Sequence, residues 1–130
     1  MKYSALRIKR AFGHKLIGNS YMKRVLCRSL LIFPNEIIGF VTKHCWFVSS
    51  FDDGWAFVLQ GEDLKKGEYL IFLSDELLKE DEKQIKYTIA HEVGHVILGH
   101  KNSIRKIQTK SEIRKQEKEA DEFAKKFLNP

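Results

Sequence analysis

Two histidines four positions apart, with a glutamate directly after the first, are the residues of this chain best suited to chemistry: His91, Glu92 and His95. At about 100° of rotation per helical residue, the two imidazoles lie roughly 40° apart on one face of a helix, where both can bind one metal ion. Glu92 is rotated away from them, as suits a carboxylate that removes a proton from a metal-bound water. The pattern predicts half of a hydrolytic zinc site, with Glu92 as the general base.

The helix that carries this pattern is expected from about Asp81 to Leu98. Asp81 with Gln84 forms a capping-box start, no proline interrupts the segment, and Gly99 follows it as a left-handed stop. Five apolar residues recur at helical spacing and predict a face that packs on a core: Ile85, Ile89, Val93, Val96 and Ile97. The histidines point away from that face, so another element must cover them. Gly94 leaves room for its close approach.

A third metal ligand is expected from the C-terminal segment, because catalytic zinc sites usually have three protein ligands and one position for water. Thr109 with Glu112 predicts the start of a helix there. The apolar face of this helix is marked by six residues: Ile113, Ala120, Phe123, Ala124, Phe127 and Leu128. Glu117 lies on this face and is the predicted ligand, with Glu119 as the substitute. Asp121, one turn further on, is placed to accept the outer N–H of a ligating histidine.

A group that stabilises the negative charge of the transition state is also expected. The donors near in sequence or in the predicted fold are Tyr87, His100 and His44, and none of them is preferred. His100 is expected in the loop after the helix. A metzincin is excluded, because Leu98 stands where that class has a glycine and Lys101 where it has the third histidine.

Two blocks of the sequence resemble the ImmA/IrrE family of bacterial zinc metallopeptidases. They are YTIAHEVGHVILGH, from Tyr87 to His100, and EKEADEFAKKFLNP, from Glu117 to Pro130. Both blocks stand in the family's order, and the strand-rich segment 46–74 before them is similar in layout. The second block departs from the family's usual Leu-Leu-Met-Pro ending, since it reads Phe-Leu-Asn-Pro here.

The resemblance implies a gluzincin-type zinc site. In such a site His91, His95 and Glu117 bind Zn²⁺, Glu92 is the catalytic base, and Asp121 bonds to a ligating histidine. The resemblance also implies a protein substrate, because better-known members of the family cleave helix-turn-helix transcriptional repressors.

The length of 130 residues predicts a single domain, 1–130. No apolar run is long enough to cross a bilayer, and the N-terminus lacks the pattern of a secretory signal, so a cytoplasmic protein with no membrane partner is expected. Cys27 and Cys45 form no Cys-x-x-Cys pair, and we expect them to be reduced and without a function of their own.

The net charge of +6 is concentrated in a basic, helical N-terminal segment, 1–33, which precedes the predicted catalytic core, 34–130. Eight basic residues come before the first acidic residue, Glu36: Lys2, Arg7, Lys9, Arg10, Lys15, Lys23, Arg24 and Arg28. Such a segment can bind nucleic acid, an anionic membrane surface or an acidic partner. A solvated helical surface is the preferred interpretation, because no helix-turn-helix signature or aromatic stacking pattern accompanies the charges.

The expected fold is α+β: a minimal zincin-like domain with N-terminal helices, a small sheet, the HExxH helix and a C-terminal helix that carries the third ligand. Helices are predicted at Ser20–Ile32 and Pro34–Lys43. Three strands are predicted to form an antiparallel meander: Trp46–Phe51, Trp55–Gln60 and Glu68–Leu73. The sheet should cover the apolar face of the HExxH helix, and the last helix should close the metal face. The third strand is the predicted edge that pairs with an extended substrate.

Together these features predict a zinc-dependent metalloendopeptidase. The alternative is a non-catalytic metal-binding module with a regulatory or interaction role, whose basic N-terminal arm contacts nucleic acid. The complete set of ligands and base favours the peptidase.

Overall fold

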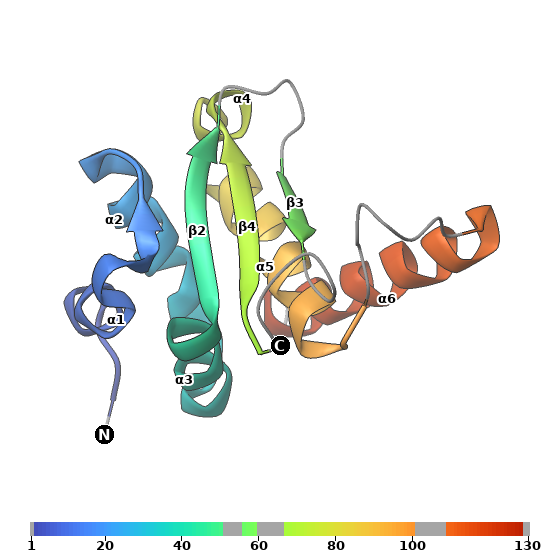
Figure 1. The fold of residues 1–130 in the computed structure, drawn as a ribbon, viewed down its shortest axis with the longest axis horizontal. Coiled ribbons are helices and arrows are strands. Elements are labelled where there is room, and N and C mark those ends of the chain that lie inside the picture. Colours follow the sequence, from blue (N-terminus) through green and yellow to red (C-terminus); the bar gives the residue numbers. More distant parts are fainter. Residues whose placement is uncertain (1, 51–55, 60–66, 101–108, 129–130) are drawn as a thin grey trace.

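The computed structural model describes residues 2–50, 56–59, 67–100 and 109–128. Its architecture is α+β: the N-terminal helices lie along one edge of a small sheet, and the two longest helices lie behind the sheet and past its other edge (Figure 1). The helices are α1 Ala5–Phe12, α2 Ser20–Ser29, α3 Asn35–His44, α4 Asp75–Leu78, α5 Glu82–Ile97 and α6 Lys110–Leu128. The strands are β1 Leu16–Ile17, β2 Cys45–Ser50, β3 Ala56–Leu59 and β4 Tyr69–Ser74.

The N-terminal helices follow local signals in the sequence. Asn19 Oδ1 accepts the N–H of Met22 at 2.8 Å and so begins α2. The predicted helix over Ser20–Ile32 is confirmed in its larger part, and its last turn, Leu30–Ile32, is a 3₁₀-helix. The helix predicted at Pro34–Lys43 is present as α3, shifted by one residue, with Pro34 as its N-cap. No helix in these described ranges is both long and apolar enough to cross a membrane.

The sheet is mixed, with the strand order β1-β2-β4-β3. β2 pairs with β4 in parallel, from Cys45 opposite Tyr69 to Ser50 opposite Ser74, whereas β3 is antiparallel to β4. The predicted three-stranded antiparallel meander was therefore wrong. β4 lies between β2 and β3, and the short β1 adds a further strand parallel to β2. The strand ends predicted at 51, 55 and 60 lie outside the described residues.

The composition of β4 explains its interior position. Within its sequence Tyr-Leu-Ile-Phe-Leu-Ser, Ile71 and Leu73 are fully buried, and Phe47, opposite Ile71 in β2, is buried as well. A nearly continuous apolar run is typical of a strand that has a parallel neighbour and helices over its faces. The prediction that Glu68–Leu73 forms an edge strand was thus also wrong, because β3 is the edge on this side of the sheet.

One hydrophobic cluster joins the N-terminal helices, the sheet and α5. Ile8 and Leu26 contribute to it from α1 and α2, and Phe47 and Ile71 contribute from the sheet. The predicted apolar face of α5 is confirmed by four residues that are at most 2% exposed: Ile85, Ile89, Val93 and Val96. Helix α5 is thereby anchored in the core along most of its length.

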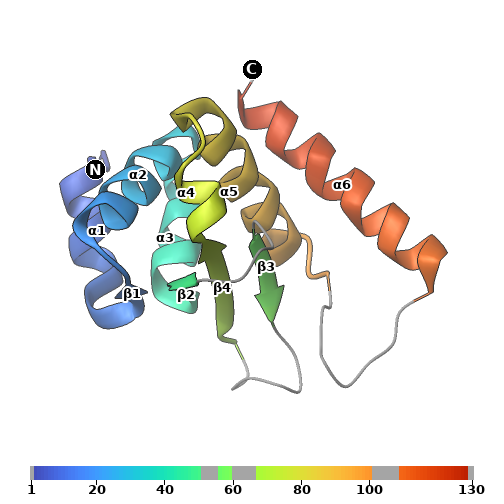
Figure 2. The same ribbon diagram turned by 90° about the horizontal axis from the view of Figure 1, so that it is seen from above.

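Helix α6 runs beside α5 and packs against it (Figure 2). Their close approach depends on Gly94. A Cβ atom added there would lie 3.0 Å from Cδ1 of Phe123, which is tighter than ordinary van der Waals contact. The glycine therefore has the packing reason that the sequence predicted for it.

Candidate metal centre

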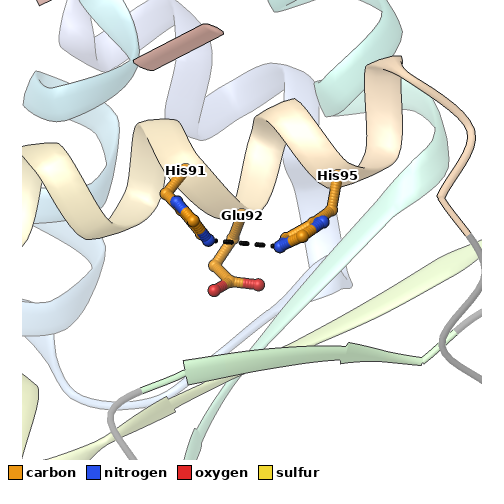
Figure 3. Close-up of side chains that lie close together, drawn as sticks. All are labelled: His91, Glu92 and His95. Atoms are coloured by element: carbon orange, nitrogen blue, oxygen red, sulfur yellow. Dashed lines mark hydrogen bonds between the residues drawn. The ribbon is translucent and has the colours of Figure 1, made fainter. Parts of the chain in front are cut away.

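Helix α5 builds the first half of the site. Asp81 Oδ1 accepts the N–H of Gln84 at 2.8 Å and begins the helix as predicted. His91 and His95 project from it one turn apart, and their Nε2 atoms lie 3.2 Å from each other (Figure 3). The two side chains are 14% and 13% exposed. The two ring nitrogens therefore face each other on a helix that the core holds in place.

Helix α6 brings a carboxylate to these nitrogens. The Thr109 hydroxyl accepts the N–H of Glu112 at 3.1 Å, which is the predicted start of the helix. Further along, Glu117 Oε2 lies 2.6 Å from His91 Nε2, and Glu117 Oε1 lies 3.5 Å from His95 Nε2. Two imidazoles and one carboxylate from two helices thus converge on one point.

The carboxylate of Glu92 lies between the two imidazoles, on the side that faces the sheet (Figure 3). Donor atoms of His91, Glu92 and His95 lie within 4.8 Å of one another. Glu92 is 7% exposed, and its burial, with the nearby charge of Glu117, raises its pKa from 4.5 to about 7 against the opposing effect of His91. A carboxyl group with this pKa can accept and return a proton near neutral pH.

Asp121 holds the outer nitrogen of His91. The Nδ1–H of His91 donates to Asp121 Oδ1 over 2.8 Å, and the Tyr87 hydroxyl donates to the same oxygen. Burial acts to raise the pKa of Asp121, but the hydrogen bond from Tyr87 and the charge of His91 outweigh it and leave this pKa below its usual value. Asp121 is therefore a carboxylate that orients the His91 ring with its Nε2 toward Glu117.

The Tyr87 hydroxyl, one of the predicted donors for the transition state, is engaged by this contact. Burial and the hydrogen bond to Asp121 raise the pKa of Tyr87 to about 12, so the phenol keeps its proton at neutral pH. In the structure that proton points to Asp121.

The outer nitrogen of His95 meets another histidine. His95 Nδ1 lies 3.0 Å from His100 Nδ1, and His100 Nε2 lies 2.9 Å from Glu119 Oε1. Burial lowers the pKa of His95 to about 4, so the ring is neutral at pH 7 and keeps a lone pair for a metal. Glu119, predicted as the substitute for Glu117, bonds instead to His100.

His44, the third predicted donor, lies in a different part of the molecule. Its Nδ1 is 2.8 Å from the carbonyl oxygen of Gly67, and its ring packs on Phe40 with the ring centroids 4.5 Å apart. No contact among the described residues links His44 to the cluster on α5. Its place at the end of α3 explains this separation.

The two histidine nitrogens are spaced as two ligands of a tetrahedral metal ion would be. Two nitrogen ligands of a tetrahedral zinc ion, with Zn–N bonds of about 2.0–2.1 Å, lie roughly 3.3 Å apart. The Nε2 atoms of His91 and His95 are separated by 3.2 Å. Two imidazoles with one carboxylate are the ligand set of several zinc hydrolases. The cluster could therefore bind a metal ion next to Glu92.

Comparison with known proteins points to the same part of the chain. Searches of curated proteins and of solved structures each found no match. A family model described as Peptidase U49 matches residues 83–129, which include nearly all of α5 and the whole of α6. This match supports a peptidase, without singling out the ImmA/IrrE family. Over the two helices that form the cluster, the chain is similar to a peptidase family, Peptidase U49.

Proposed function

We propose that this protein is a zinc-dependent metalloendopeptidase with His91, His95 and Glu117 as the zinc ligands and Glu92 as the general base. The observation that carries the proposal is the convergence of these side chains from α5 and α6. The match of residues 83–129 to a peptidase family independently supports the peptidase part of the proposal. The resemblance to ImmA/IrrE enzymes supports the same ligands.

The buried carboxyl of Glu92 moves the proton in this mechanism. A bound zinc ion would polarise the scissile carbonyl and acidify a water molecule. Glu92 takes one proton from that water as the new C–O bond forms. The same carboxyl delivers this proton to the amide nitrogen as the C–N bond breaks, so that an acid and an amine leave and Glu92 returns to its starting state.

Strand β3 is the element best placed to align a substrate. It lies opposite the face of α5 that carries His91, Glu92 and His95 (Figure 3). Among the described strands it pairs with β4 alone, so one of its backbone edges faces away from the sheet. An extended peptide can bind such an edge through main-chain hydrogen bonds and bring its scissile carbonyl to the site. β3 therefore takes the role that was predicted for Glu68–Leu73.

The proposed substrate is a protein, with a helix-turn-helix transcriptional repressor as the first candidate class. Support for this class comes from the resemblance to ImmA/IrrE enzymes. Cleavage at a strand edge requires an extended segment, so we expect the cut in a loop or tail of the substrate.

The decisive experiment compares the zinc-loaded protein with its Glu92→Gln variant on a helix-turn-helix repressor encoded by a neighbouring gene. We expect a single cut by the unaltered protein and a loss of about 100- to 10,000-fold in the variant, because the general base is gone. Zinc content should stay the same. Glu122→Gln, on the exposed surface of α6, is the matched control.

Two results would contradict the proposal. Cleavage that persists in Glu92→Gln would remove Glu92 from the reaction. Zinc binding without cleavage of any repressor, peptide or unfolded protein would favour the non-catalytic metal-binding module.

A further inference from the structure

We propose that His100 and Glu119 are positioning residues that hold His95 in the orientation and tautomer needed to bind a metal. This inference rests on the function proposed above and adds two residues to the site. It is carried by the end of α5, by the hydrogen bonds that lead from His95 to α6, and by the burial of His100.

The end of α5 places His100 against His95. Gly99 has φ +71°, in the left-handed region where a side chain is strained. Its N–H bonds to the carbonyl of Val96 at 3.2 Å, and the N–H of His100 bonds to the carbonyl of His95 at 3.0 Å. These two bonds form a Schellman C-cap. The turn brings the ring of His100 to within 5.2 Å of the ring of His95, measured between centroids.

If the rings of His95 and His100 are both neutral, the hydrogen bonds that join them to Glu119 allow one arrangement of protons. A carboxylate can only accept, so His100 Nε2 donates to Glu119. The lone pair of His100 is therefore on Nδ1, where it accepts the Nδ1–H of His95. His95 is left with its lone pair on Nε2, the atom that faces His91 and Glu117. The chain of bonds thus selects the nitrogen that can bind a metal.

Burial makes these contacts necessary for His100. The residue is 8% exposed, so both ring nitrogens need partners within the protein. His95 supplies one and Glu119 supplies the other. Helix α6 thereby holds both histidines from outside, through Asp121 for His91 and through Glu119 and His100 for His95.

The first test is the tautomer of His95 in the metal-free protein, measured by ¹⁵N NMR of the ring nitrogens. We expect the proton on Nδ1 in the unaltered protein and a mixture of tautomers in His100→Ala. Glu122→Ala, which removes an exposed carboxylate of the same helix, should change nothing. A proton on Nε2 of His95 in the unaltered protein, or an unchanged tautomer in His100→Ala, would overturn the inference.

The second test is zinc affinity, measured by competition with a chromophoric chelator. Loss of a group that orients a ligand typically weakens metal binding by about 10- to 100-fold, and we expect a loss in this range for His100→Ala and Glu119→Ala. His100→Asn keeps an acceptor near the position of Nδ1, and Glu119→Gln keeps one for His100. Both should recover part of the affinity. Glu119 is 44% exposed, so its variants should fold even if His100→Ala does not.

The outcomes separate this inference from the proposed function. Unaltered affinity in the Glu119→Ala and His100→Ala proteins would overturn the positioning role. The absorption spectrum of bound Co²⁺ reports which ligands hold the ion. If it indicates a third histidine ligand that is lost in His100→Ala, His100 is itself a ligand, and the positioning role is overturned as well. If the unaltered protein binds no zinc, the peptidase proposal fails, and the NMR measurement still decides how His95 is held.

Discussion

The N-terminal helices and the α5–α6 pair bury different kinds of side chain. In the N-terminal helices the buried side chains are mostly apolar, such as Phe12 and Met22, and the buried polar ones, Ser29 and Thr42, carry only hydroxyl groups. On α5 and just after it, the buried residues include a carboxylic acid, Glu92, and an imidazole, His100. Burying such groups is unfavourable unless they are bonded or have a function. The N-terminal helices thus stabilise the fold. The α5–α6 pair buries ionisable groups at the candidate metal site, which costs part of that stability.

The basic residues of the N-terminal segment lie on its surface or in contacts that support the fold. The three basic residues of α1 are exposed: Arg7, Lys9 and Arg10. Two others are used within the protein: Lys15 donates to the carbonyl of Thr42 at 2.7 Å, and Arg28 pairs with Glu82 at the start of α5. These two contacts of the basic segment therefore help to join the N-terminal helices to the rest of the molecule.

The largest expected effect is in the N-terminal helices. Phe12 is 1% exposed and packs edge-on against Phe47, with ring centroids 5.7 Å apart. Phe12→Ala should lower the free energy of unfolding by about 3–5 kcal/mol, because it removes buried surface and leaves a cavity. Urea unfolding measures this loss. Because Phe12 lies outside the α5–α6 site, the folded variant should bind zinc with unchanged affinity. A parallel loss of zinc affinity would show that packing in the N-terminal helices also determines the site.

A smaller effect of opposite sign is expected at Glu92 in the metal-free protein. Its pKa of about 7 in the folded chain lies above the ordinary value of 4.5, so stability falls as the pH rises between these values. The Glu92→Gln variant buries no charge at this position. At pH 8 its free energy of unfolding should therefore be roughly 3 kcal/mol higher than that of the unaltered protein. At pH 4 the two proteins should be equally stable. Urea unfolding at both pH values, with a chelator present, measures the difference, and equal stability at pH 8 would contradict the stated cost.

The smallest effect concerns a pair of glycines, one in each region. Gly94→Ala would press a methyl group on Phe123 and move α6, so zinc affinity should fall by about tenfold, the lower end of the effect of displaced ligand-orienting groups. Adding Phe123→Ala should restore part of it. Gly39→Ala on α3 is the control, since its methyl group meets nothing nearer than the Tyr3 hydroxyl at 3.8 Å. Equal zinc affinity in the Gly94→Ala and Gly39→Ala variants would show that the contact between α5 and α6 does not determine the position of the metal ligands.

Local signals in the sequence predicted much of the site. The capping residues Asp81 and Thr109 gave the starts of both helices, and helical rotation placed Glu117 and Asp121 on the side of α6 that meets α5. These predictions succeed because each depends on the geometry of a single helix.

The predictions that failed depend on contacts between distant segments. The order of strands follows from the pairing of β2 with β4, which no turn residue encodes, so a meander was the simplest reading of three consecutive strands. The link from His95 through His100 to Glu119 was missed because His100 lies past the helix end, where rotation angles no longer apply. Gly99 was the available signal, since a left-handed stop predicts that the next residue folds back on the last turn.

Helix α6 is attached more lightly than α5. Of its described residues, Ala120 and Ala124 are buried, and Phe123 and Phe127 pack against the core while partly exposed. Fluctuations that detach one segment from a folded protein begin where little surface is buried. We therefore expect the amide protons of α6 to exchange with solvent sooner than those of α5. Glu117, Glu119 and Asp121 all belong to α6, so each detachment of this helix would remove all three carboxylates from the site at once.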